Sequence, residues 1–411
     1  MDIKNIINSY NNTNLVIRIF IGIIIGACLA VILPNSSWIE IFGSLFVGSL
    51  KAIAPILVFV LVISSLAQGN KKSDGRFRTV VVLYLIATFL AAISAVIFSY
   101  IFPQDLLLDV NTNGYQVPQS IDEVTQNMLV KIVINPLSSL TEGNYLGILF
   151  WSIISGLALK NIAAESTKSL LQDFANGVSQ VVSWIINFAP FGIMGLVYSA
   201  VSTNGIDIFT TYGKLLVLLV GCMLFVALIT NPLIVYFVLK KNPYPLILKC
   251  LKESGITAFF TRSSAANIPV NLTLCKNLGL DKEVYSVSIP LGATINMSGA
   301  AVTITIMALA AVQTLGIEVH LVTAFLLSIL ATFGACGASG VAGGSLLLIP
   351  MACSLFGISN DIAIQVVGVG FVVGVIQDSM ETALNSSSDV VFSATSEYKQ
   401  LLAQGKEIPK I

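Results

Sequence analysis

Five polar residues on the last apolar segment of the chain have the types and the spacing to bind an ion or a polar solute. They are Asp378, Glu381, Thr382, Asn385 and Asp389. Since an α-helix turns about 100° per residue, their side chains fall within roughly a third of the helix circumference. An aspartate at the centre of a membrane helix costs about 2.5–3.5 kcal/mol, so such residues face a protein interior or a watery cavity. We therefore expect this stripe to form half of a binding site inside the membrane.

The composition indicates an integral membrane protein. Hydrophobic residues make up 55% of the 411 residues and charged residues only 10%, whereas soluble domains carry about 25% charged residues. The 21 basic and 21 acidic residues leave no net charge, so we expect no nucleic acid partner. The six cysteines are scattered through apolar segments and are expected to be small buried residues. The polar N-terminus has no signal-peptide cleavage pattern, and we expect no processing.

Eight segments are long and apolar enough to cross about 30 Å of hydrocarbon as helices. They are residues 15–33, 43–67, 79–102, 145–163, 181–203, 213–239, 286–315 and 361–394. Lysine and arginine concentrate in alternate loops, whereas the polar loop 103–144 has one lysine and five acids. Because basic loops remain cytoplasmic, we expect both termini in the cytoplasm. The loop 103–144 is then external, with a short helix near 119–134.

Two other apolar stretches are interrupted in the middle. Residues 253–275 contain a polar run around Arg262 and Pro269, and residues 321–357 contain a glycine-rich run. Each half has about ten residues, which is too short to cross. Entering from opposite sides, the stretches predict two re-entrant helical hairpins related as an inverted repeat. Their broken backbones would offer helix N-termini to a carboxylate and carbonyl oxygens to Na⁺. Two ordinary spans with kinks are the alternative.

These stretches resemble the dicarboxylate/amino acid:cation symporter family, which has the glutamate-transporter fold. The resemblance covers nearly the whole chain and is strongest over residues 255–394. Its motifs are the tip at 262–264 with Pro269, the run PLGATINMSGA at 290–300, the run GASGVAGG at 337–344, and the polar stripe. Within the family the likeness is to the bacterial sodium:serine/threonine symporters. It implies an all-α membrane protein of eight transmembrane helices plus two re-entrant hairpins, forming a homotrimer in the inner membrane.

The resemblance further implies an elevator mechanism, in which one domain moves as a body against a scaffold. The scaffold would comprise residues 1–78 (helices 1 and 2) and 103–212 (the external loop with helices 4 and 5). The transport domain would comprise residues 79–102 (helix 3) and 213–411 (helices 6 to 8, both hairpins and the cytoplasmic tail). The implied activity is import of serine and threonine by sodium symport. No enzymatic activity and no cofactor are expected, and Na⁺ would be the coupling ion.

The residues that the resemblance places at the substrate are Arg262, Ser263, Ser264, Ser339, Gly340, Asp378, Glu381, Thr382 and Asn385. Asp378 would receive the ammonium group of an amino acid. Thr382 and Asn385 would hold its carboxylate, together with the backbone N–H of Ser264. The second tip, around Ser339 and Gly340, would close over the substrate.

The residues that the resemblance places around two sodium ions offer mainly backbone carbonyl groups. They are Gly292, Thr294, Asn296, Met297, Ala335, Cys336, Ala338, Asn385 and Asp389. The carboxylate of Asp389 would balance the charge of one ion. The family's NMDGT motif is NMSGA here, so Ser298 replaces the aspartate that helps to hold a further sodium. We therefore expect a lower sodium stoichiometry.

Glu381 stands where glutamate transporters have an arginine for the side-chain carboxylate of the substrate. A negative residue repels a dicarboxylate and can accept a hydrogen bond from a hydroxyl group. We therefore expect a small neutral hydroxy amino acid. Three structural alternatives remain open: Asp378 could pair with Arg262, Glu381 could be protonated or pair with Arg262, and Asp389 could be a simple helix-end acid.

Three other functions are alternatives at this stage. A proton-coupled dicarboxylate carrier on the same fold is disfavoured by Glu381. An intramembrane serine protease is suggested by the run GASG at 337–340, but its serine needs a histidine partner. The one histidine, His320, lies in a predicted external connection and has no second metal ligand beside it. A channel would be recognised by a conductance far above the turnover of a carrier.

Overall fold

The computed structural model describes residues 15–34, 36–68, 75–108, 130, 133–205, 208–338 and 343–409, and every regular element among them is helical. The first part forms α2 (Leu15–Ile32), η1 (Ser37–Ile39), α3 (Glu40–Ala67), α4 (Gly75–Ile101), α6 (Pro136–Glu142), α7 (Tyr145–Ile162), α8 (Glu165–Asn187) and α9 (Ala189–Asn204). The second part forms α10 (Ile208–Phe225), η3 (Val226–Thr230), α11 (Asn231–Leu239), α12 (Tyr244–Cys250), η4 (Leu251–Gly255), α13 (Ile256–Thr261), α14 (Ser264–Asn277), α15 (Lys282–Ile295), α16 (Ser298–Thr314), α17 (Leu321–Ala335), η5 (Gly344–Leu348), α18 (Ile349–Ser354) and α19 (Asn360–Ala403).

Within the described residues, five helical segments are long and apolar enough to cross a membrane, and the bent pair α8–α9 makes a sixth. They are residues 40–64, 75–101, 208–239, 282–314 and 360–403, while α2 and α7 are apolar but shorter. The protein is therefore a multi-pass membrane protein. The short helix expected near 119–134 lies largely outside the described residues.

Two of the expected element bounds are wrong. The expected span at 181–203 is divided, because α8 and α9 meet at an angle of 53° next to Pro190. Proline favours the first turn of a new helix and disrupts the interior of an old one. The first interrupted stretch begins at Tyr244 rather than at residue 253, since α12, η4 and α13 form one continuous helical arm. The sequence analysis missed this amphipathic helix because the exposed Lys252 and Glu253 interrupt its apolar run.

Three helix breaks lie in the two interrupted stretches and in the run 290–300 that carries part of the resemblance. The first is at Arg262, which has a left-handed φ of 52°, and Ser263 caps the following α14 by accepting from the Ala266 N–H. The second separates α15 from α16 at Asn296 and Met297, whose dihedrals are not helical. The third follows α17, and its residues 339–342 lie outside the described part of the chain.

The arms on either side of the first and third breaks double back. We call η4–α13–α14 the first helix pair and α17–η5–α18 the second helix pair. In the first pair, Ser254 donates to Asn271 at 2.5 Å, and Asn267 donates to the Ser254 carbonyl, so the arms lie side by side. In the second pair, α17 and α18 pack on each other and on α16.

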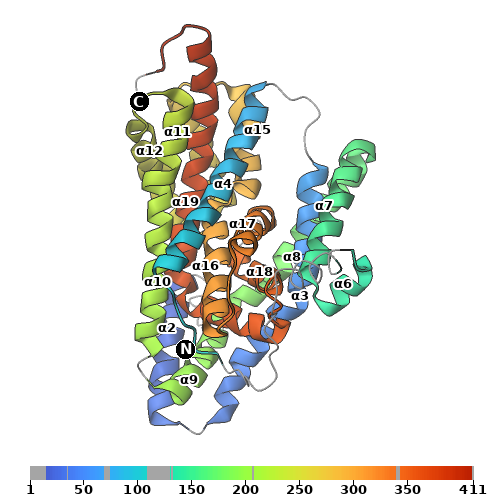
Figure 1. The fold of residues 1–411 in the computed structure, drawn as a ribbon, viewed down its shortest axis with the longest axis vertical. Helices are drawn as coiled ribbons and strands as arrows, with labels where there is room; N and C mark the ends of the chain where they lie inside the picture. The colour runs from blue at the N-terminus through green and yellow to red at the C-terminus, as the bar shows by residue number, and fades with distance from the viewer. Residues whose placement is uncertain are drawn as a thin grey trace, which may run out of the picture.

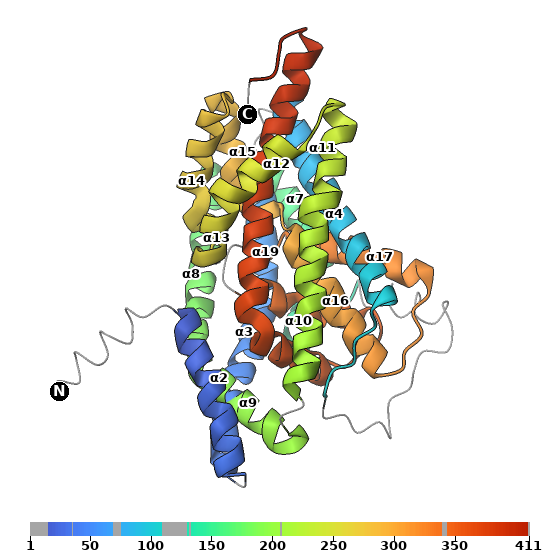
Figure 2. The ribbon, with the colours of Figure 1, turned by 90° about the vertical axis from the view of Figure 1, so that its left-hand side faces the viewer.

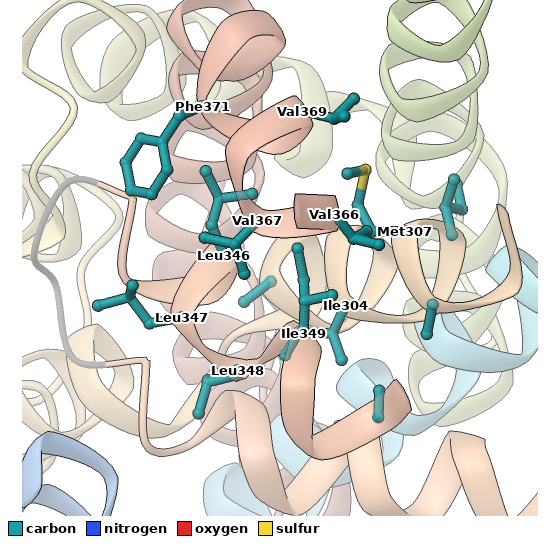
Figure 3. Packing of buried hydrophobic residues seen from close by; sticks show 14 of the residues in the cluster. Ile304, Met307, Leu346, Leu347, Leu348, Ile349, Val366, Val367, Val369 and Phe371 are labelled. Atoms are coloured by element: carbon teal, nitrogen blue, oxygen red, sulfur yellow. The ribbon is translucent and has the colours of Figure 1, made fainter. Parts of the chain in front are cut away.

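The 44-residue helix α19 runs through the centre of the molecule and touches both pairs (Figure 2). Buried apolar side chains hold the second pair against α16 and α19 (Figure 3). They are Leu346, Leu347, Leu348 and Ile349 of the second pair, Ile304 and Met307 of α16, and Val366, Val367, Val369 and Phe371 of α19. This packing places the beginning of η5 beside the middle of α19.

The helices fall into two groups by their contacts (Figure 1). Helices α2, α3, α7, α8 and α9 pack mainly on one another, as do α4 and the elements from α10 to α19. The groups meet through α19 and the second pair, with a contact of 5.1 Å between the ring centroids of Phe46 and Phe371. An ion pair of 2.5 Å joins Lys51 of α3 to Asp361 of α19.

Ion pairs join one end of α4 to the ends of α15 and α19. The Arg76 guanidinium lies 2.8 Å from the Asp281 carboxylate and 3.5 Å from that of Glu397. The hydrogen bond from Arg76, followed by the one from the Glu283 N–H, lowers the pKa of Asp281 below its ordinary value. These contacts tie together three helices that carry or support the polar stripe.

The crossing of α2 and α9 predicts an effect on stability. A Cβ atom on Gly26 would lie 2.4 Å from the Met194 carbonyl oxygen, so Gly26→Ala must push the two helices apart. We expect a loss of about 1–3 kcal/mol, the usual cost of overpacking. Gly221→Ala on α10 is the matched control, because a Cβ there meets no atom within 4 Å, and alanine gains up to about 1 kcal/mol in helix propensity. Thermal unfolding of the purified variants tests this, and equal midpoints would contradict the predicted crossing.

Candidate functional site

Asp378 is the point at which both helix pairs meet α19. The Arg262 Nε donates to Asp378 Oδ2 at 2.7 Å, and the Gly343 backbone N–H donates to Asp378 Oδ1 at 3.1 Å. Only 3% of Asp378 is exposed. The structure thus realises the pairing of Arg262 with Asp378, one of the alternatives that the sequence left open. The left-handed backbone at Arg262 turns its side chain toward α19 at the end of α13.

Glu381, one turn further along α19, is surrounded by neutral donors. Its Oε2 accepts from Thr303 Oγ1 at 2.8 Å, from Ser345 Oγ at 2.8 Å and from Gln377 Nε2 at 2.5 Å. Glu381 therefore does not share the guanidinium of Arg262 with Asp378. Sequence reasoning missed Thr303, Ser345 and Gln377. Only Gln377 gave a signal, since it precedes Glu381 by four residues and so lies on the same helix face.

Thr382 and Asn385 link α19 to its own backbone and to the start of α16. Thr382 Oγ1 donates to the Asp378 carbonyl at 2.8 Å. Asn385 Oδ1 accepts from the Gly299 N–H at 2.7 Å, and its Nδ2 contacts Met297 Sδ at 3.4 Å. Asn385 thus fixes the first turn of α16 beside the polar stripe.

Asp389 and Asn296 form a buried oxygen-rich group. Asn296 Nδ2 donates to Asp389 Oδ1 at 2.9 Å and to Ser388 Oγ at 2.8 Å. Within the described residues, Asp389 Oδ2 and Asn296 Oδ1 are buried without a hydrogen-bond partner. Buried oxygens without donors are costly, and a hard cation is a partner that they suit. A Cβ on Gly292 would come within 2.5 Å of Asp389 Oδ1, so a larger residue there would have to displace the carboxylate.

The other residues expected at a cation lie at the ends of α15 and α17. Cys336 contacts the Ile295 carbonyl at 3.5 Å, which brings these two ends together. The Ala335 carbonyl accepts from the Ala338 N–H at 2.9 Å and keeps a second lone pair. Thr294 Oγ1 turns back to the Leu291 carbonyl at 2.7 Å. The contact between Cys336 and Ile295 therefore brings the end of α17 against the end of α15.

Two of the expected tip residues are placed and two are not. Ser263 caps α14, and Ser264 is its buried first residue, whose N–H has no partner within the helix. Ser339 and Gly340 lie outside the described residues. His320 is the exposed N-cap residue that precedes α17, and among the described residues it has no contact with the polar stripe.

Buried acids along one face of a central membrane helix, contacted by the ends of broken helices, are typical of an ion-coupled secondary carrier. The chain belongs to the sodium:dicarboxylate symporter family, whose family model matches residues 15–398. It is a transporter and not an enzyme.

The chain is also similar to named transporters over almost their whole length. The chain is 60% identical over 407 residues to the serine/threonine transporter SstT of Bifidobacterium adolescentis, covering 99% of this chain and 95% of the relative. It is 59% identical to the serine/threonine transporter SstT of Streptococcus agalactiae and 56% identical to that of Streptococcus thermophilus. Each of these two alignments covers 96% of this chain and 98% of the relative.

The buried pair of Arg262 and Asp378 predicts strong coupling between the two residues. Arg262→Met leaves Asp378 without its counter-charge, and such changes cost roughly 3–5 kcal/mol. Adding Asp378→Asn removes the unpaired charge, so the double variant should regain much of the loss. Thermal unfolding of both single variants and the double variant measures the coupling. If the two losses are additive, the ion pair does not contribute as described.

Proposed function

We propose that the protein imports serine and threonine together with Na⁺ across a bacterial inner membrane. The observation that carries the proposal is the shared contact of both helix pairs with Asp378, because a ligand bound there is in contact with both tips at once. The names of the relatives support serine and threonine as the substrates.

In this proposal Asp378 receives the ammonium group of the amino acid. Thr382 and Asn385, with the backbone N–H of Ser264, hold the carboxylate. The two oxygens of Asp378 accept from Arg262 and Gly343, and each oxygen has a second lone pair that can accept from the ammonium group. The second tip, around Ser339 and Gly340, then closes over the substrate.

Glu381 supplies the preference for a hydroxyl group in this proposal. Its Oε2 is occupied by three protein donors, whereas no described residue donates a hydrogen bond to Oε1. A carboxylate oxygen accepts well from a hydroxyl group, and the negative charge disfavours a second carboxylate on the substrate. Serine and threonine fit both conditions.

We propose two sodium positions. The first lies between Asp389 and the oxygens of Gly292, Asn296 and Asn385, and it is supported by the buried oxygens of Asp389 and Asn296 that lack donors. The second uses carbonyls at Thr294, Ala335, Cys336 and Ala338, with Met297 beside them. One Na⁺ moving inward through 100 mV supplies about 2.3 kcal/mol toward uphill transport.

The proposed architecture has eight transmembrane helices, two re-entrant hairpins and cytoplasmic termini. The hairpins are the first and second helix pairs. The scaffold is the group α2, α3, α7, α8 and α9, and the other group is the transport domain that moves in the elevator motion. Subunits assemble as a homotrimer through the scaffold, where α8 carries the exposed side chains of Leu170, Phe174 and Trp184.

Binding of serine to the purified protein, with and without Na⁺, tests the proposed function. We expect Na⁺ to tighten serine binding and Asp389→Asn to abolish this effect, a change of roughly tenfold or more in affinity. Asp378→Asn should weaken serine binding whether or not Na⁺ is present. Asp173→Asn, which alters an exposed acid on α8, is the matched control and should bind as the unaltered protein does.

Uptake into proteoliposomes completes this test. Serine uptake that is driven by a pH gradient without Na⁺ and is blocked by succinate would replace this proposal with a proton-coupled dicarboxylate carrier.

The ion pair of Lys51 with Asp361 tests the proposed motion, because it links the proposed scaffold to the proposed transport domain. Any sliding of α19 along α3 by several ångströms breaks this contact. Asp361→Asn should change the transport rate by about 1.4- to fivefold without changing serine affinity, since exposed ion pairs contribute about 0.2–1 kcal/mol. Exchanging the charges, Lys51→Asp with Asp361→Lys, should restore the rate. An exchanged variant no better than Asp361→Asn would argue against a state-dependent pair.

A further inference from the structure

Glu381 accepts more hydrogen bonds from protein side chains than it needs in order to accept one from a substrate hydroxyl group. Its three donors come from three elements: Thr303 from α16, Ser345 from η5 and Gln377 from α19 itself. At most 1% of each of these three residues is exposed. All three donors reach the same oxygen, Oε2. If these hydrogen bonds only stabilised a buried carboxylate, donors divided between its two oxygens would do so equally well.

Concentrating the donors on one oxygen fixes the direction of the other. The two oxygens of a carboxylate are rigidly joined, so holding Oε2 from three sides leaves Oε1 pointing away from Thr303, Ser345 and Gln377. The start of α16 also lies close against Glu381, because a Cβ on Gly299 would lie only 2.8 Å from its Cα and 3.0 Å from its Cγ. The neighbouring Arg262 guanidinium consequently remains with Asp378, and Oε1 remains free to accept.

Gln377 is the residue least explained by packing alone. Its Nε2 donates both to Glu381 Oε2 and to Thr303 Oγ1 at 2.7 Å. Among the described residues its Oε1 is buried with no hydrogen-bond partner, which destabilises the fold. An apolar side chain of the same size would avoid that loss. The glutamine therefore serves the orientation of Glu381 rather than the stability of α19.

Ser345 connects this orientation to the second helix pair. It lies in the first turn of η5, three residues beyond the end of the tip 339–342. Gly343, two residues earlier, is the donor to Asp378. The second pair thus touches α19 at two acids one turn apart, and both contacts are lost if the pair swings away.

We propose that Gln377, Thr303 and Ser345 are positioning residues that make hydroxyl recognition depend on closure of the second helix pair. Gln377 and Thr303 hold Glu381 so that its Oε1 faces the substrate. Ser345 completes the set of donors only when the pair is closed. Selection of serine over alanine is then expressed in the closed state, in which the carboxylate has its final direction. The inference rests on the proposed function, because it assumes that an amino acid binds beside Asp378.

The test compares the affinities for serine and alanine of the purified full-length protein in Na⁺. In Ser345→Ala, Gln377→Leu and Thr303→Val we expect the preference for serine over alanine to fall by roughly tenfold, which corresponds to about 1.4 kcal/mol. Ser345→Thr keeps the hydroxyl group and should retain most of the preference. Thr305→Val is the matched control, since Thr305 is equally buried on α16 and its hydroxyl has no partner among the described residues.

The possible outcomes separate this inference from the proposed function. If the unaltered protein binds no serine in Na⁺, or binds alanine as tightly as serine, the proposed function fails at its substrate. If it prefers serine and the three variants keep that preference, the proposed function stands and the positioning role is wrong. An equal loss of serine and alanine binding in Ser345→Ala also overturns the inference, because Ser345 would then affect closure alone.

Discussion

Burial of acids on a single helix is the constraint on which the rest of this structure depends. Asp378, Glu381 and Asp389 are at most 6% exposed, and a buried carboxylate is tolerated only with partners that replace water. Each acid has a different kind of partner. Asp378 has a guanidinium and a backbone N–H, Glu381 has three neutral donors, and Asp389 has an asparagine amide. The three acids therefore have three different chemical environments along one face of α19.

The helix breaks follow from this constraint. The interior of an intact helix has no free backbone donors or carbonyls, so backbone partners such as the Gly343 N–H must come from places where helices end. The breaks at Arg262, at Asn296 and after α17 all lie against the polar stripe. Broken backbone is tolerated at such depth only where it is enclosed by protein, and α19 with α16 encloses it here. The same ends that satisfy the acids are the groups that could open and close around a ligand.

Asn385 joins the two ends of the polar stripe. Its side chain holds the Gly299 N–H and Met297, both at the break that also carries Asn296. Asn296 in turn donates to Asp389. A cation that ordered this break would fix Asn385 as well, and Asn385 lies one turn from Glu381 and Thr382. Binding of an ion at Asp389 and binding of a solute at Asp378 would therefore be linked through the contacts of a single residue, Asn385.

Composition and periodicity alone determined that this is a helical membrane protein, where its two interrupted stretches break, and which face of the last helix is polar. These properties depend on near neighbours in the chain, so they can be read locally. The bounds of α12 and α8 were missed because amphipathic helices leave no apolar run.

The partners of the acids were decided only by the tertiary structure. Arg262 could have met Asp378 or Glu381, and the spacing of those acids favours neither. Arg262 and Asp378 are 116 residues apart, and Thr303 and Glu381 are 78 apart. Such pairs form only when separate helices pack, so packing, and not local pattern, set the chemistry of each acid.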